Sequence, residues 1–122
     1  MDPKTPGYED TLRRLTLSDE RFVRGVLGGP SEPGLEGPLG PKTVRLVRLG
    51  ALIALNAGDS AIGAETDAAL AAGASRDDVV GVLLAVGPSI GLARLVDVAP
   101  RIADALGYDV LAALDRPEEL RA

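Results

Sequence analysis

Apolar residues recur along most of the chain at the spacing of α-helices, and no segment shows the alternation of apolar and polar residues that marks a strand. Gly, Pro, Ser and Asp interrupt this pattern where helices begin and end. The sequence therefore predicts an all-α protein with helical segments at 8–15, 19–27, 41–57, 60–72, 76–87, 92–106 and 108–114.

Short polar side chains before the apolar segments predict N-caps, because their oxygens accept hydrogen bonds from the unpaired backbone N–H groups of a first turn. The predicted caps are Ser18, Asp59 or Ser60, and Ser75, which has Asp78 at capping-box spacing. Gly87-Pro88 is expected to end one helix, so that Ser89 or Gly91 opens the next. Pro100 is expected to kink or divide that next helix.

Residues 28–40, GGPSEPGLEGPLG, separate the first two predicted helices from the others. This composition is typical of a loop. It divides the chain into residues 1–40, with the N-terminal helices and the connecting loop, and residues 41–122, a compact helical core. We interpret the loop as a surface connection or as an arm laid along a neighbouring copy.

Two helical segments of the core carry charges among apolar residues. The segment 41–57 is apolar nearly all round, which predicts a central helix, but Arg45 and Arg48 stand one turn apart on it. In the stretch GDSAIGAETDAALAAGAS (58–75), Glu65 has only Ala and Ile three and four residues away. If the two helices are antiparallel neighbours, Arg45 lies within reach of Glu65.

These charges have two interpretations. One is structural: Glu65 forms an ion pair or faces a subunit interface, and the two arginines are solvated at the edge of their helix. The other is a small pocket with a base and an anion-binding arginine. Ser89, near a predicted helix start, is either a simple cap or a further donor to an anion.

The amino-acid composition limits the partners and the kinds of chemistry that are expected of this chain. The net charge is −5 and no basic block is interleaved with aromatics, so a nucleic-acid partner is not expected. The chain has no Cys and no His, which excludes thiol nucleophiles and thiolate metal sites and leaves Asp or Glu as a general base, with Lys or Tyr as less favoured choices. The acidic pairs Asp77-Asp78 and Glu118-Glu119 point apart on a helix, so we expect no metal site. The glycines of 28–40 do not match a phosphate-binding loop.

The longest apolar run, residues 79–96, is interrupted by Gly87-Pro88 and carries Arg94, so no membrane span is expected. The N-terminal MDPKTPGYED lacks the apolar run of a signal peptide. We therefore expect a cytoplasmic protein. The composition is 46% hydrophobic with few aromatics, which suits closely packed helices and predicts that some apolar surface is buried against other copies.

Residues 38–107 resemble the carboxymuconolactone decarboxylase family, which includes the alkylhydroperoxidase D-like proteins. The resemblance rests on LGPKTVRLVRLGALIAL and ALAAGASRDDVVGVLLAVGPSIGLARLVDVAP, in the order helix, small-residue helix, ALAAGAS, acidic cap and VLLAV-P--G. The N-terminal LRRLTLSDERFVRGVLG resembles the lead-in segment of some members. The resemblance implies a helical bundle and a homo-oligomer, commonly a trimer or a hexamer.

At the positions that carry chemistry in the family, this chain differs. The resemblance places the two cysteines of peroxidase members at Gly58 and Ala61, their histidine at Glu65 and their helix glutamate near Arg45. None of these groups is retained, so thiol-based peroxidase or disulfide reductase activity is excluded. Glu65 and Arg45 still place charges at the family's pocket, which is expected between their two helices and near residues 87–91.

Two functional hypotheses follow. In the first, a cofactor-free enzyme uses Glu65 as general acid or base and Arg45 to hold a carboxylate or stabilise an oxyanion. The side chains expected on its substrate side are Arg48, Ser89 and Ala61. Its reaction is decarboxylation, isomerisation, or lactone or ring chemistry on a small acidic or carbonyl compound. In the second, the charged pair only specifies packing, and the protein is a catalytically inactive binding or assembly module.

Overall fold

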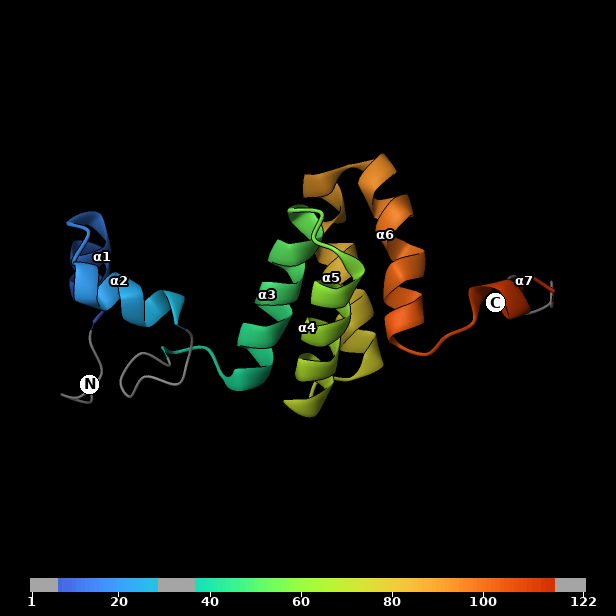
Figure 1. Ribbon diagram of the computed structural model, residues 1–122, viewed down its shortest axis with the longest axis horizontal. Coiled ribbons are helices and arrows are strands. Elements are labelled where there is room, and N and C mark those ends of the chain that lie inside the picture. Colours follow the sequence, from blue (N-terminus) through green and yellow to red (C-terminus); the bar gives the residue numbers. More distant parts are fainter. Residues whose placement is uncertain (1–6, 29–36, 116–122) are drawn as a thin grey trace. The chain divides into compact units, whose positions relative to one another are not determined.

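The computed structural model describes residues 7–28 and 37–115. Within these ranges the chain forms seven α-helices and no strand, which confirms the all-α prediction (Figure 1). The chain divides into two units, Met1–Gly40 and Pro41–Ala122. Most of the predicted 28–40 loop and the pair Glu118-Glu119 lie outside the described residues. No described helix combines the length and the apolar character that crossing a membrane requires.

The first unit contains two short helices, α1 (Tyr8–Thr16) and α2 (Glu20–Leu27). Asp19, not the predicted Ser18, caps α2: its carboxylate accepts a hydrogen bond of 3.3 Å from the backbone N–H of Phe22. Ser18 has a φ of 54°, in the left-handed region, and makes the turn between the two helices. The prediction was wrong because Ser18 and Asp19 both carry a side-chain oxygen that is able to cap α2. The turn between α1 and α2 uses Ser18, so Asp19 is left as the residue before the helix.

The second unit is a bundle of four helices followed by a short one. The helices are α3 (Pro41–Ala54), α4 (Asp59–Ala71), α5 (Arg76–Ile90), α6 (Leu92–Ala105) and α7 (Val110–Leu114). α3 packs on α4 and α5, α6 packs on the same two helices, and consecutive helices of the four run in opposite directions (Figure 1). The buried side chains at the centre come from all four helices and are Leu49, Ile53, Ile62, Val79, Leu83, Val98 and Ile102. Burial of each contributes about 1.5–3 kcal/mol.

The approach of α3 to α5 depends on a glycine. A Cβ added at Gly50 would lie 3.3 Å from Cγ1 of Val86 and 3.5 Å from Cγ1 of Val82. A side chain at position 50 would crowd these two valines and push the helices apart. Because Gly50 has no side chain, Val82 and Val86 fill the space between α3 and α5. This close packing suits a core that contains no aromatic side chain.

The prediction that the helix beginning at Pro41 is central is wrong for the single chain. Leu49, Gly50 and Ile53 of α3 are buried, but Val47 is 57% exposed on the opposite side of the helix. α3 therefore buries one face only, and its remaining apolar residues are left at the surface of this unit.

Two prolines lie inside helices: Pro88 was predicted to end its helix, and Pro100 was predicted to kink or divide its helix. α5 continues through Gly87 and Pro88 to Ile90, where Gly91, with a φ of 86°, ends α5 and precedes α6. Gly91 thus opens the last long helix, as one of the two predicted alternatives, and Ser89 does not. Pro88 lies in the last turn of α5, where it has no N–H to donate to the carbonyl oxygen of Leu84, and the helix ends two residues later. α6 is not divided at Pro100, because Val98 and Ile102 on either side are anchored in the core.

The remaining boundaries differ from the predictions by a few residues. α3 ends at Ala54 because Asn56 takes a φ of 56°, and Gly58 rather than Asp59 or Ser60 precedes α4. α7 begins at Val110, where Asp109 accepts a hydrogen bond of 3.0 Å from the backbone N–H of Ala112. Local backbone turns set these ends.

The predicted capping box at the start of α5 is confirmed. The Ser75 hydroxyl accepts a hydrogen bond of 2.9 Å from the backbone N–H of Asp78, and the Asp78 carboxylate accepts one of 2.9 Å from the backbone N–H of Ser75. The latter hydrogen bond is the main cause that lowers the pKa of Asp78 below its ordinary value. Lys42, with its Nζ 4.0 Å from Oδ2, lowers it by a smaller amount.

One polar side chain is buried in the bundle without a partner. Thr66 of α4 is fully buried, and its Oγ1 has no hydrogen-bond partner among the described residues. A buried hydroxyl that makes no hydrogen bond destabilises a fold, because it has lost its hydrogen bonds to water.

The capping box predicts a pH-dependent contribution to stability. Because the pKa of Asp78 is lower in the folded chain, its contribution is complete above its ordinary pKa and is lost as the pH falls through the lowered value. The stability difference between the wild type and Asp78→Ala should be constant above about pH 5 and should shrink below about pH 4. Denaturant unfolding across this range measures it. Asp77→Ala, one residue away, is the control, and its stability difference from the wild type should not change over this pH range. An equal shrinkage of the stability difference for both variants at low pH would contradict the prediction.

The unpaired hydroxyl predicts that Thr66→Val stabilises the protein. The change keeps the shape of the side chain and removes the unsatisfied group, so the free energy of unfolding should rise by about 1 kcal/mol. Chemical denaturation measures the change. Thr43→Val, at an exposed position of α3, should alter stability by no more than about 0.5 kcal/mol. A loss of stability in Thr66→Val would show that the hydroxyl has a partner.

Candidate functional site

Arg45 and Glu65 meet between α3 and α4. Nη1 of Arg45 donates a hydrogen bond of 3.4 Å to Oε1 of Glu65. The side chain of Glu65 is 15% exposed and that of Arg45 is 34% exposed. The two charges therefore compensate each other at the edge of the core, where water reaches the arginine more easily than the carboxylate.

The position of Glu65 follows from the periodicity of α4. Ile62, three residues before it, and Ala69, four residues after it, are buried in the core. Glu65 lies at the border of this buried face, on the side that contacts α3. Ala61, which was predicted to line the substrate side, is exposed and shelters the carboxylate little.

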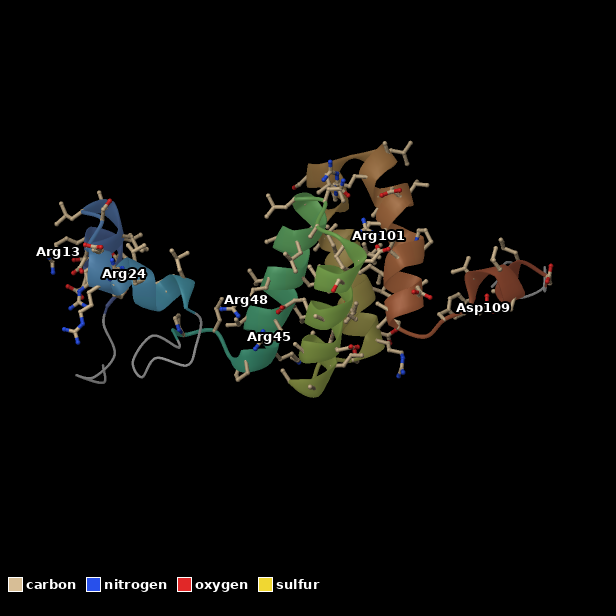
Figure 2. All side chains as sticks on the ribbon, viewed as in Figure 1. Arg13, Arg24, Arg45, Arg48, Arg101 and Asp109 are labelled. Carbon is tan, nitrogen blue, oxygen red and sulfur yellow. The ribbon has the colours of Figure 1, made fainter. Side chains whose placement is uncertain are left out.

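The other predicted residues are not brought to this pair. Arg48 lies one turn after Arg45 on α3, half-buried, and makes no ion pair among the described residues (Figure 2). Ser89 is exposed in the last turn of α5, so it does not stand at a helix start. Ser89 lies two residues before Gly91, which precedes α6, and its role as a donor to an anion stays a prediction. The role of Arg48 as a ligand to substrate stays a prediction.

A second arginine site, which the sequence pattern did not predict, lies at the turn between α3 and α4. Arg101 of α6 contacts the carboxylate of Asp59, the carbonyl oxygen of Ala57 and, at 3.5 Å, Oδ1 of Asn56 (Figure 2). Arg94, also on α6, donates a hydrogen bond of 2.9 Å to the carbonyl oxygen of Ala54.

These contacts satisfy backbone carbonyls at and beyond the C-terminal end of α3 and fix the start of α4. The signal in the sequence was weak: Arg94 and Arg101 are seven residues apart, which places them on one face of a helix. The turn that this face contacts lies more than forty residues away in sequence.

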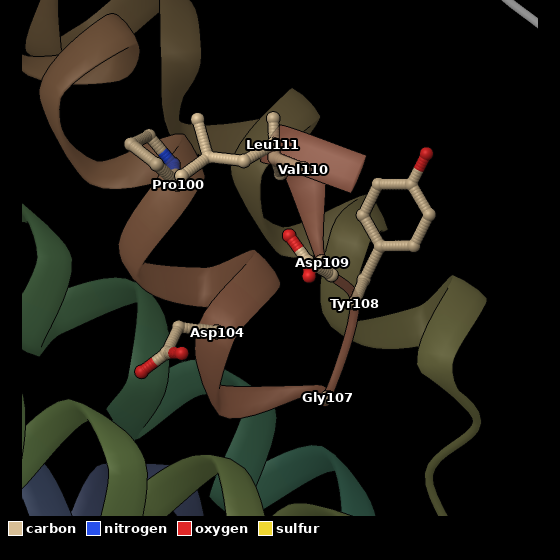
Figure 3. A pocket seen from close by; sticks show the side chains of 7 residues that line it. All are labelled: Pro100, Asp104, Gly107, Tyr108, Asp109, Val110 and Leu111. Atoms are coloured by element: carbon tan, nitrogen blue, oxygen red, sulfur yellow. The ribbon is translucent and has the colours of Figure 1, made fainter. Parts of the chain in front are cut away.

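Two surface pockets lie on α6. One, of about 270 Å³, is lined by residues of α4 and α6: Asp59, Ile62, Gly63, Pro100, Arg101, Asp104 and Ala105. The other, of about 470 Å³, lies between α6 and α7 (Figure 3); its lining is Pro100, Asp104, Gly107, Tyr108, Asp109, Val110 and Leu111. Neither is lined by Arg45 or Glu65, so the predicted pocket beside that pair stays a prediction. Among the described residues, no group of three His, Cys, Asp or Glu side chains is placed to hold a metal ion.

A comparison with known protein families matches residues 26–105, well over half of the chain, to the carboxymuconolactone decarboxylase family. The chain belongs to this family. The match confirms the resemblance seen in the sequence and covers α3 to α6 completely, so the Arg45–Glu65 pair lies inside the family region. No curated protein and no solved structure matches the chain.

The part of the chain that matches the carboxymuconolactone decarboxylase family lacks two residue types that often carry chemistry. The region that carries the family match contains no Cys and no His. A side chain in this region that moves a proton must therefore come from its Asp, Glu or Lys residues, and Glu65 is a carboxylate that lies at the edge of the core beside a cation.

The geometry predicts a measurable coupling between Arg45 and Glu65. Exposed ion pairs contribute at most about 1 kcal/mol and breaking a buried pair costs about 3–5 kcal/mol, so this half-buried pair should couple by about 1 kcal/mol. A double-mutant cycle with Arg45→Met and Glu65→Leu, followed by denaturant unfolding, measures it. The cycle between Arg48→Met and Glu65→Leu is the control and should give no coupling. Equal coupling in the two cycles would mean that Arg45 is not the specific partner.

Proposed function

We propose that this protein is a cofactor-free enzyme of small-molecule metabolism that acts on a carboxylate or carbonyl compound at the Arg45–Glu65 pair. The observation that carries the proposal is the pair itself. A carboxylate sheltered by the core meets a guanidinium that is more open to water, within the region that matches the carboxymuconolactone decarboxylase family. This arrangement supplies an acid–base group and an anion-binding group side by side.

Arg45 is suited to exchange its partner for a substrate. A guanidinium has several N–H donors in one plane and binds carboxylates in a two-pronged manner. Only Nη1 is used by Glu65, and its distance of 3.4 Å is at the long end of hydrogen bonds. A substrate carboxylate that takes two donors of Arg45 gains a stronger contact than the one it displaces.

Glu65 then lies next to the bound molecule as the proton-transfer group. For a β,γ-unsaturated carbonyl compound, the carboxylate of Glu65 removes a proton from the carbon beside the carbonyl, Arg45 stabilises the oxygen of the resulting dienolate, and Glu65 returns the proton at the γ carbon as the double bond moves into conjugation. For a β-keto acid, loss of carbon dioxide leaves an enolate that takes a proton from the protonated form of Glu65. These steps need no thiol, metal or cofactor.

A homo-oligomer is part of the proposal. Leu84 of α5 is 73% exposed, and Leu92 of α6 is 77% exposed in the single chain. Large apolar side chains so exposed on neighbouring helices support burial against other copies, because contiguous apolar patches often mark interaction sites. The family implies a trimer or a hexamer, and a neighbouring copy would be able to close the open side of Arg45. We infer a cytoplasmic location from the sequence alone.

The second candidate is a catalytically inactive assembly module. It is supported by the same exposed leucines. In this case the ion pair only fixes the packing of α3 against α4.

Binding of small acids separates the two candidates. We expect malonate and acetoacetate to raise the melting temperature of the wild type and of Glu65→Gln at constant ionic strength, and not that of Arg45→Gln. The uncharged malonamide should have no effect. Arg24→Gln, at an exposed arginine of α2, is the control and should respond as the wild type does.

Turnover is then measured by NMR on the acids that bind, and Glu65→Gln should bind them without converting them. If none of the acids binds, and Arg45→Met/Glu65→Leu assembles to the same oligomer as the wild type in light scattering, the protein is an assembly module.

A further inference from the structure

The charges of α1 and α2 are placed differently from those of the other described helices. Both helices have an acidic first turn and an arginine in the last turn, whereas none of the five described helices of the second unit has a basic residue in its last turn. In α1 the acids are Glu9 and Asp10, and the arginines are Arg13 and Arg14 (Figure 2). α1 also lies before residue 26, where the family match begins.

α1 carries an apolar stripe of three side chains, which are Tyr8, Leu12 and Leu15. They are spaced by four and three residues, so they share one face of the helix. All three are open to water in the single chain, with exposed fractions of 74%, 56% and 42%. The stripe therefore runs the length of α1 and is left uncovered by the described residues.

The contact between α1 and α2 uses a different side of α1. Arg14 lies over the ring of Phe22, with its Cζ 5.5 Å from the ring centroid. Arg14 follows Leu12 by two residues, which places it about 200° further around the helix. α2 therefore contacts the polar side of α1, and the apolar stripe faces away from α2.

These two helices are too short to be stable through local interactions. α1 has nine residues and α2 has eight, and in the described part of the chain only Gly25, which has no side chain, is buried in them. Helices of this length are marginal in water, and in proteins most helical stability comes from packing of an apolar face. The stripe of α1 therefore gains from a partner that covers it.

The charges of α1 favour a second copy of the chain as this partner. In an antiparallel pair with a two-fold axis near Leu12, the acidic first turn of each α1 lies beside the basic last turn of the other. Glu9, which makes no ion pair among the described residues, then faces Arg13 of the second copy. Residues 8–27 have four acids and four arginines, so no net charge opposes their association. Helices that lie on membranes are instead rich in Lys and Arg on the polar face.

We propose that α1 is a self-association element in which two copies pair through the apolar stripe in antiparallel orientation. Leu12 meets Leu12 of the second copy near the two-fold axis, and Tyr8 of each copy meets Leu15 of the other. A contact of three side chains per copy is small, so the pairing is transient between free molecules and stronger where another contact holds copies together. It is independent of the proposed catalytic activity.

Disulfide trapping of the full chain tests the pairing, because the chain has no cysteine and an introduced one is unique. In the proposed pair the two copies of position 12 meet, whereas the two copies of position 8, or of position 15, are about 10 Å apart along the helix axes. Under mild oxidation Leu12→Cys should form a covalent dimer at least about tenfold faster than Tyr8→Cys or Leu15→Cys, because a disulfide needs closely spaced Cα atoms. A mixture of Tyr8→Cys and Leu15→Cys should form the mixed dimer as fast as Leu12→Cys forms its own.

Charge-swapped chains provide a second measurement. Glu9→Arg and Arg13→Glu, each combined with Leu12→Cys, should form the mixed dimer in about fivefold excess over either homodimer, because only the mixed pair matches acids with arginines on both sides. The matched control is the same exchange on α2, with Glu20→Arg and Arg24→Glu, and should give no excess. An equal excess in the control would contradict the proposed register.

A variant of the core separates this pairing from the proposed homo-oligomer. Leu84→Ser/Leu92→Ser removes apolar side chains proposed for assembly of the core, and it should keep the order of the cross-linking rates. The proposal is overturned if that order is lost in this variant, or if the three single-cysteine chains cross-link at equal rates or in the order of exposure of the replaced side chains. Such rates would mean that copies meet by chance and that another partner covers the stripe.

Discussion

The bundle depends on close packing of helices around a core without aromatic side chains. The centre of the second unit is filled by Leu, Ile and Val from four helices. Such a core stays dense only if the helices approach closely, and Gly50 and Gly87 allow this at the α3–α5 and α5–α6 contacts, where an added Cβ would lie 3.3 Å from a neighbouring side chain. The Arg45–Glu65 pair lies at the edge of this core, and Arg101 contacts the turn between α3 and α4.

α4 carries three different environments on one short helix. Ile62 and Ala69 face the core, Glu65 faces α3, and Gly63 faces α6. Its five alanines and single glycine leave room beside the polar groups, so the helix contributes little bulk to its neighbours. A carboxylate on one side and an open pocket on the other can therefore belong to one helix without mutual contact.

Much of the fold could be predicted from local sequence signals. The helices, the Ser75–Asp78 capping box and the neighbouring positions of Arg45 and Glu65 follow from spacing along the chain. The errors arose where tertiary contacts or turn geometry decide. Pro88 is held within its helix, and Asp19 rather than Ser18 forms the cap, because the turn places Ser18 in the left-handed region. Arg101 was missed because its partners are distant in sequence.

The contacts of Arg101 make the α3–α4 hairpin dependent on the last helix of the bundle. A short connection between adjacent antiparallel helices is usually a local element, but here Asp59 and Ala57 are bound by a side chain more than forty residues further along. Backbone hydrogen bonds such as that from the N–H of Ala57 to the carbonyl oxygen of Leu52 form the turn locally, and the contacts of Arg101 are added only when α6 has docked. Because α6 follows α3, α4 and α5 in the chain, the hairpin lacks these contacts during synthesis until nearly all of the bundle has been made.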